Sequence, residues 1–426
     1  MKICRFRILT WLALAAFASE ALTAPLWAAG DAPALSLPQL LDEARRANPD
    51  LLAARKRWEA AQAKVPLAGG LPAPKIGVEW EEIPRGTIKV NQAMLMYQLI
   101  QSIPFPGKLS ARRRVAVKEA QVAAMAFKQA EWDVVSQVKS AYYDLFLLDR
   151  EQEIQSEQTL WITQAAASAH AGYASGAASQ AELLQAQAEL LEATNQASVL
   201  RHRRAAMAAH LNHALNRAVQ NPLERLGAIP LTPVRFSPEE LVAIARDHQP
   251  ELLAFRFSAE RADAALRLAK RELLPDIETM FELRDPAMGP IGPWDLSLAV
   301  VLPFWFWTKL RYGVKMAVYD KASAEAAYQA MQNEIARRIH EHWHQAVAAY
   351  QTAKLSQEGL IPLGTQAVTG ALAAYQSGRG SFMELSAALR SLSERKRAYF
   401  RQLVELQQHV VMLEQSVGVS LVTSGQ

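Results

Sequence analysis

The sequence predicts a mainly helical protein with a small β part, written as two copies of one design. Residues 36–108 and 237–309 match one another at an offset of 201 positions, 237 − 36, as in Leu51-Leu52-Ala53 and Leu252-Leu253-Ala254. Four short segments alternate between apolar and polar residues, and long stretches of helical periodicity surround them. A tandem repeat builds the same structure twice, so each half should contribute two strands and the same helices.

The chain divides into three parts. Residues 1–30 combine basic Lys2, Arg5 and Arg7, a short apolar run and a small-residue exit, which is typical of a secretory signal peptide. Cys4 is the only cysteine and lies in this segment, so we expect an exported protein without disulfides. The first repeat is expected at 31–226 and the second at 227–426.

The alternating segments are predicted strands at about 75–82, 92–102, 276–284 and 294–304. Their length is that of a membrane-spanning strand, and their apolar faces suit lipid. Their other faces suit water, because they carry Glu79, Glu81, Asp276, Glu278, Glu282 and Asp295. A soluble hairpin with one face on a core is the alternative. Four strands are too few to close a membrane barrel, so a protomer in lipid must borrow strands from copies of itself.

The remaining chain is predicted to be helix. No proline occurs between Leu109 and Tyr173, and apolar residues recur at heptad-like spacing in both halves. Each long helix should end at a Tyr-x-Ser-Gly turn, after which Ser179-x-x-Glu182 or Ser381-x-x-Glu384 starts the next helix as a capping box. Ser36-x-x-Gln39 and Ser237-x-x-Glu240 should start the earlier helices in the same way. The expected order in each half is helix, strand, strand, long helix, turn, helix.

This order, the duplication and the phrase Gln101-Ser102-Ile103-Pro104-Phe105-Pro106-Gly107-Lys108 resemble the TolC-like outer-membrane efflux proteins. Within that family, Pro-Phe-Pro-Gly-Lys is most similar to the heavy-metal efflux subgroup, although the second copy, Leu302 to Lys309, lacks the glycine. The resemblance implies a homotrimer with a twelve-stranded barrel in outer-membrane lipid of a Gram-negative bacterium. It also implies a periplasmic helical tunnel that docks on a periplasmic adaptor and an inner-membrane RND-type pump.

The resemblance also assigns roles to the two turns. It implies that they dock the adaptor, through Tyr173, Gly176, Ser179, Tyr375, Gly378 and Ser381. It further implies that Glu182 and Glu384 ring the periplasmic mouth, where carboxylates select cations. A purely capping role for the two glutamates is the alternative from the residues themselves.

Other chemistry has little support in the sequence. There is no nucleophile with a paired base, no glycine-rich phosphate loop and no Cys/His metal framework, so we expect neither an enzyme nor a cofactor. A formal net charge of +4 does not favour nucleic acid. His340 and His344 share a helix face and are weak metal candidates, because two ligands do not complete a site and a solvated face also explains them.

The expected function is therefore a passive exit duct for small toxic cations, in particular heavy metals. A multidrug or type I secretion duct would have the same architecture, since the inner-membrane pump chooses the cargo. A soluble periplasmic coiled-coil adaptor would also have a signal peptide and paired helices. Such an adaptor should lack strands with one lipid face and one water face.

Overall fold

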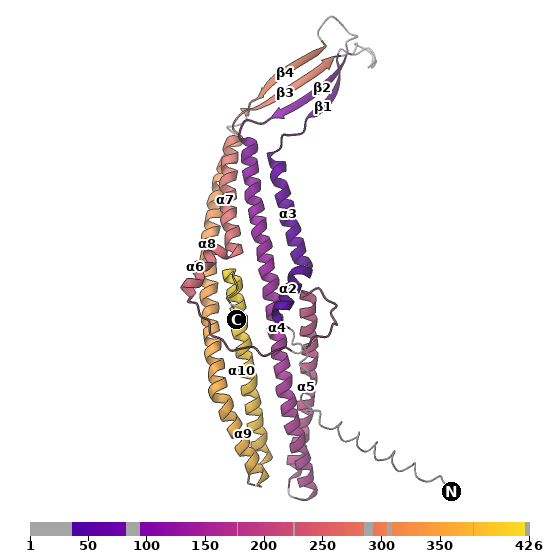
Figure 1. Ribbon diagram of the computed structural model, residues 1–426, viewed down its shortest axis with the longest axis vertical. Coiled ribbons are helices and arrows are strands. Elements are labelled where there is room, and N and C mark those ends of the chain that lie inside the picture. Colours follow the sequence, from indigo (N-terminus) through magenta and orange to yellow (C-terminus); the bar gives the residue numbers. More distant parts are fainter. Residues whose placement is uncertain are drawn as a thin grey trace, which may run out of the picture.

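The protein is elongated, with a sheet at one end and helices along the rest of its length (Figure 1). The computed structural model describes residues 36–81, 94–176, 178–224, 226–284, 293–304, 309–377 and 379–421. The predicted signal peptide, Gly378 and the predicted strand residues 82, 92 and 93 lie outside these ranges.

The two halves have the same order of elements. The first contains α2 (Leu37–Ala47), α3 (Pro49–Gly69), β1 (Lys75–Glu81), β2 (Met94–Ile103), α4 (Lys108–Ala174) and α5 (Gln180–Ala214). The second contains α6 (Pro238–His248), α7 (Pro250–Arg271), β3 (Asp276–Arg284), β4 (Trp294–Val301), α8 (Leu310–Leu355), α9 (Ile361–Gln376) and α10 (Phe382–Val417). A π-helix, Ser356–Leu360, joins α8 to α9. The predicted mainly helical fold with four strands is confirmed.

Each expected first helix is in fact two helices, which corrects the prediction of a single one. The breaks fall before Pro49 and Pro250, because a residue that precedes proline is disfavoured in the helical region. Asn48 and Gln249 are extended and cap the following helix: Asn48 accepts from the Asp50 amide at 2.9 Å, and Gln249 accepts from the Leu252 amide at 2.6 Å. At the starts of the preceding helices, Ser237 and Glu240 form the predicted capping box, but the Ser36 side chain accepts no capping bond.

The long helices of the two halves differ. Helix α4 is continuous over 67 residues, about 100 Å at 1.5 Å per residue. The second rod is interrupted, because Pro362 has no N–H and its ring would crowd the carbonyl of residue i−4, Glu358. Glu358 lies in the π-helix, whose wider turn accommodates the proline.

The core lies between helices in the middle of the molecule. Its largest cluster combines α2, α4, α5 and α10, with Leu145, Phe146, Leu211 and Leu403 each at most 1% exposed. The connection from α5 to α6 contributes Leu223 and Leu226 to this cluster, and so ties the first half to the second. A second cluster joins α6, α8 and α10, and a third lies among α4, α5 and α10 near the helical tips. The sheet lies outside all three clusters.

Candidate functional site

The sheet is amphipathic and antiparallel, in the order β1-β2-β3-β4. Residues opposite one another in such a sheet share a face. Two rows of apolar side chains therefore cross all four strands, Val78-Tyr97-Leu283-Trp294 and Ile76-Leu99-Phe281-Leu296. With their neighbours they form what we call the apolar face: Ile76, Val78, Trp80, Tyr97, Leu99, Ile103, Phe281, Leu283, Trp294, Leu296, Leu298 and Val300.

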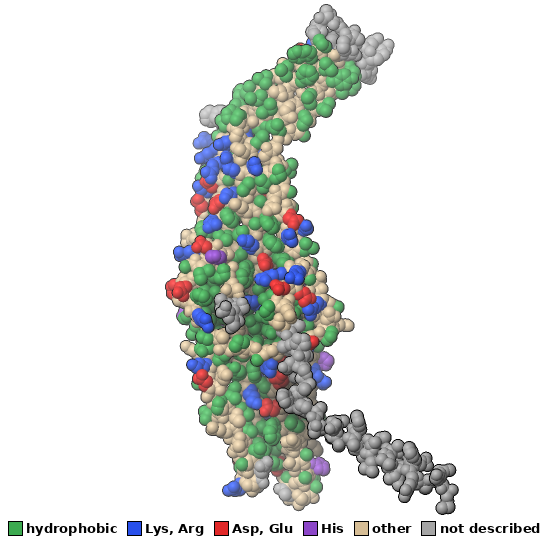
Figure 2. Space-filling view, in the orientation of Figure 1, with side chains coloured by type: hydrophobic (Ala, Val, Ile, Leu, Met, Phe, Trp, Pro, Cys, Tyr) green, Lys and Arg blue, Asp and Glu red, His purple; other side chains and the backbone are tan. Residues whose placement is uncertain are grey.

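The apolar face is open to solvent in the single chain. Each of its side chains is between 38% and 82% exposed. Figure 2 shows hydrophobic side chains over the sheet, whereas charged side chains gather along the helices. Exposed patches of this kind mark surfaces that contact a partner or a membrane. Among the described helices, none has the length and the apolarity that a membrane span requires.

The opposite surface of the sheet carries carboxylates, and we call it the acidic face. It carries Glu79, Glu81, Asp276, Glu278, Glu282 and Asp295, as the register requires. Gln98 of β2 donates to Glu282 of β3 at 3.0 Å and also to Glu79 of β1, so one amide links carboxylates of the two flanking strands. Arg284 pairs with Asp295 on the next strand. The sequence-predicted division into a lipid-suited and a water-suited face is present.

Both edges of the sheet are open. Within the described ranges, β1 pairs only with β2, and β4 pairs only with β3. An edge strand presents unpaired N–H and C=O groups, which can pair with a strand of another chain.

The Pro-Phe-Pro-Gly-Lys phrase forms the junction between sheet and helices. Lys108 is only 2% exposed, and its Nζ lies 2.8 Å from Asp276 and 2.7 Å from the Leu274 carbonyl of the other half. Asp276 also accepts from the Phe105 amide at 2.7 Å. Gly107 has φ +92°, and the guanidinium of Arg271 fills the place where a Cβ would stand. The motif therefore fastens β2 and α4 to the start of β3, a role that sequence reasoning missed.

The two helical turns lie at the end farthest from the sheet (Figure 1). Tyr173 lies in the last turn of α4, Ser179 caps α5, and Gly176 between them has φ +75°, a conformation that favours glycine. In this turn the Ser179 hydroxyl accepts from the Glu182 amide at 3.2 Å, whereas the Glu182 carboxylate does not accept from the Ser179 amide, so the predicted capping box is half formed. Tyr375 and Ser381 flank the α9–α10 turn, where Ser381 and Glu384 form the complete capping box.

The turns contact one another within the chain. Tyr375 packs on a cluster that contains Ala169, Ala186 and the buried Phe382. Burial raises the pKa of Tyr375, and the nearby carboxylate of Glu182 raises it further. The structure thus brings Glu182 close to the second turn, whereas the Glu384 side chain is exposed.

The predicted histidine pair is not assembled into a site. His340 and His344 are both exposed, and the described residues contain no group of three or more His, Cys, Asp or Glu side chains that could hold a metal ion. Instead, His342 stacks on His409 of α10 with ring centroids 5.6 Å apart. Burial lowers the pKa of His409, and His342 lowers it further.

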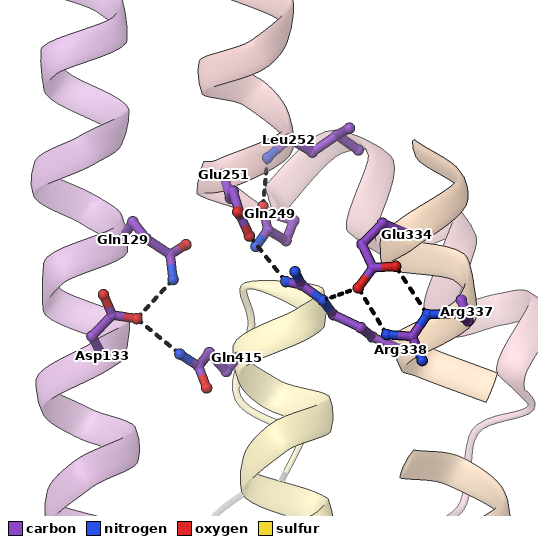
Figure 3. Close-up of polar contacts among 9 residues, drawn as sticks. All are labelled: Gln129, Asp133, Gln249, Glu251, Leu252, Glu334, Arg337, Arg338 and Gln415. Carbon is purple, nitrogen blue, oxygen red and sulfur yellow. Dashed lines mark hydrogen bonds and ion pairs between the residues drawn. The ribbon is translucent and has the colours of Figure 1, made fainter. Parts of the chain in front are cut away.

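Polar contacts also fix the helices around the end of α10 (Figure 3). Asp133 of α4 accepts from Gln129 and from Gln415 of α10, both at 2.8 Å. On α8, Arg338 contacts Glu251 of α7 at 3.2 Å and Glu334 at 2.8 Å. Hydrogen bonds from Arg337 and Arg338 lower the pKa of Glu334 to about 2. No sequence motif indicated the contacts of Asp133 with Gln415 and of Arg338 with Glu251, because these partners come from separate helices.

The family model for outer membrane efflux proteins matches residues 40–217 and again residues 241–419. The chain belongs to the outer membrane efflux protein family. It is 21% identical to the cobalt-zinc-cadmium resistance protein CzcC of Cupriavidus metallidurans over 388 residues, which are 90% of each chain.

Solved structures of other outer membrane proteins have the same fold. The outer membrane protein VceC of Vibrio cholerae superposes with a TM-score of 0.77 at 17% identity, over 91% of this chain and 97% of VceC. The CmeC outer membrane channel of Campylobacter jejuni gives a TM-score of 0.74 at 16% identity, over 90% of this chain and 85% of CmeC.

Membership settles location and broad class. This efflux protein resides in the outer membrane and has a large periplasmic helical part, as the sequence predicted. Its family is one of efflux proteins, and a structural neighbour, CmeC, is an outer membrane channel, so the prediction that it is not an enzyme is confirmed. The apolar face is the surface of the described chain that suits lipid.

Proposed function

We propose that this efflux protein is the exit duct of a tripartite pump and conducts small toxic cations, in particular heavy metals, out of the cell. One observation carries the proposal: a membrane-length sheet has an exposed apolar face and an acidic opposite face, at one end of a helical body. An apolar outer surface contacts lipid, and an acidic inner surface favours cations in water.

The duct is a homotrimer. An open strand edge is not tolerated in hydrocarbon, and four strands are too few for a membrane barrel. Three chains provide twelve strands and leave no edge. The family to which the chain belongs supports this assembly, with an adaptor and an inner-membrane RND-type pump as partners. The turns around Tyr173, Gly176, Ser179, Tyr375, Gly378 and Ser381 are the proposed adaptor-docking surface, since the described ones lie farthest from the sheet.

Glu182 and Glu384 form the cation-selecting mouth. Both lie in the first turn of a helix at the end opposite the sheet, where six carboxylates of a trimer would repel one another. The double variant Glu182→Ala with Glu384→Ala should raise single-channel conductance in bilayers and weaken block by divalent cations. Ser381→Ala is the matched control, because it removes a cap and keeps both carboxylates. Unchanged conductance and block in a folded double variant would reject the mouth.

The proposed cargo rests on three supports. CzcC, a relative over 90% of the chain, is named for cobalt, zinc and cadmium resistance. The acidic face places six carboxylates along the sheet. The Pro-Phe-Pro-Gly-Lys phrase is the third support, through the resemblance to the heavy-metal subgroup.

A strain that lacks this protein tests the cargo. It should become more sensitive to cobalt, zinc, cadmium or copper, and the wild-type chain should restore tolerance, while tolerance of dyes and detergents stays unchanged. Hypersensitivity to drugs with normal metal tolerance would indicate a multidrug duct. Loss of a secreted protein would indicate type I secretion, and release by a carbonate wash would indicate a soluble adaptor.

A further inference from the structure

The sequence repeat relates the open edges of the sheet to its closed centre. Strand β4 is the second copy of β2, and β1 is the first copy of β3, at the 201-residue offset. Inside the chain, β2 pairs with β3. If the equivalent strands pair in the same way between two chains, β4 of one chain joins β1 of the other.

The offset converts the internal register into one between chains. Leu99 lies opposite Phe281, and Ile100 opposite Met280. Adding 201 to the first member and subtracting it from the second gives Val300 opposite Trp80, and Val301 opposite Glu79. We propose that β1 of a second copy of this chain adds to β4 in this register. The proposal rests on the trimer proposed above and specifies which residues meet at its seam.

The two faces of the sheet agree with this register. Val300 and Trp80 both belong to the apolar face, and Val301 and Glu79 both lie on the opposite side. A slip of one residue would put Trp80 opposite Val301 and move an apolar set to the wrong face. Only registers that differ by an even number of residues keep the apolar side chains on one face. The repeat offset specifies one of these registers.

The unequal strand lengths support the same seam. In β2, residues 101–103 are paired by β3 alone, since the β1–β2 register ends at Ile100. The equivalent residues 302–304 follow the end of β4 at Val301 and have no described strand partner. Phe304 is 76% exposed, and its partner in the proposed register, Ile76, is 82% exposed. Pro303 would lie opposite Gly77, which has no side chain to obstruct the ring.

The junction chemistry differs between the internal and the proposed seam. Inside the chain, Lys108 contacts Asp276 and Glu272. At the repeat offset, Lys309 takes the place of Lys108, Lys75 that of Asp276 and Leu71 that of Glu272. The ion pairs cannot recur, so the seam between chains depends on strand pairing and apolar contact, with Leu71 60% and Leu302 52% exposed.

Disulfide trapping in the full-length chain tests the register. Directly opposite residues in a strand pair have Cα atoms 4.5–5.5 Å apart, within the range that a disulfide spans, whereas diagonal neighbours are about 7–8 Å apart. Val301→Cys with Glu79→Cys should yield a covalent trimer on a non-reducing gel, because each chain bonds to the next. We expect cross-linking at least about tenfold faster than for the shifted pair Val301→Cys with Glu81→Cys. The repeat-equivalent internal pair, Ile100→Cys with Met280→Cys, should close within one chain and is the matched control.

Each other outcome has a defined meaning. Faster cross-linking of the shifted pair would overturn the register. If native mass spectrometry shows a trimer and the internal control closes, but neither the Val301 pair nor Val300→Cys with Trp80→Cys links chains, the proposed seam is wrong and the trimer stands. A monomer in the same measurement would refute the proposed trimer itself.

Discussion

The buried ion pair between Lys139 of α4 and Glu414 of α10 provides a quantitative test of helix packing. The side chains of Lys139 and Glu414 are 10% and 2% exposed, and the Lys139 ammonium donates to the carboxylate. Glu414 also accepts from the Leu421 amide at 3.0 Å and from the Ser420 hydroxyl at 3.1 Å. Lys139→Met keeps the side-chain stem but leaves the carboxylate without its cation.

The expected cost follows from that geometry. Breaking a buried pair by removing one partner costs about 3–5 kcal/mol, because the other charge stays buried. The hydrogen bonds from Leu421 and Ser420 remain, so we expect the lower end, about 3 kcal/mol. Adding Glu414→Gln to Lys139→Met removes the stranded charge and should recover part of the loss.

The assay is denaturant unfolding of the detergent-solubilised protein, followed by circular dichroism, for the wild type, the single variant and the double variant. A loss below about 1 kcal/mol in Lys139→Met, or no recovery in the double variant, would refute the reasoning.

Three further predictions concern single sites. Because the pKa of His409 is lowered in the folded state, the unfolded state binds more protons. The stability that neutral His409 contributes is full above the ordinary histidine pKa of about 6.5 and is lost as the pH falls through the lower folded-state pKa. His409→Gln should therefore make the melting temperature in thermal melts less dependent on pH in this range. Lys108→Met should cost about 1–3 kcal/mol, whereas the exposed Lys309→Met should change stability by less than about 0.5 kcal/mol in the same melts. Glu384→Ala breaks a complete capping box and should lower the melting temperature more than Glu182→Ala, whose carboxylate returns no bond.

Local sequence patterns predicted the elements well where one physical cause dominates. Alternation with a period of two placed β3 at its observed bounds and β1 within a residue of its end, since a strand with one apolar side has no other periodicity. The absence of proline predicted α4. The helix breaks at Pro49 and Pro250 could also have been predicted, because residues before proline avoid the helical region. The sequence interpretation instead placed a single helix before the strands of each repeat.

Contacts between distant helices could not be read in this way. Lys139 and Glu414 are 275 positions apart, and only the packing of α4 on α10 makes them partners. The histidines give a second example: spacing along α8 drew attention to His340 and His344, whereas His342 meets His409 from another helix. Ser179 and Ser381 both accept a hydrogen bond from the glutamate amide, but only the Glu384 carboxylate accepts one from its serine amide. A capping pattern fixes where a helix begins and does not fix the glutamate rotamer.

The central pairing of the sheet governs when the sheet can form. Thr279 donates to the Gln101 carbonyl at 3.2 Å across 178 positions, so β2 meets β3 only after all of α4 and α5 has emerged and folded back. Closing so long a loop adds little free energy, since each doubling of its length costs only about 0.6 kcal/mol, but non-local pairing is slow. Each hairpin can form early from its own half. A newly exported chain therefore carries two separate apolar hairpins until its helices bring them side by side, and only then can β2 pair with β3.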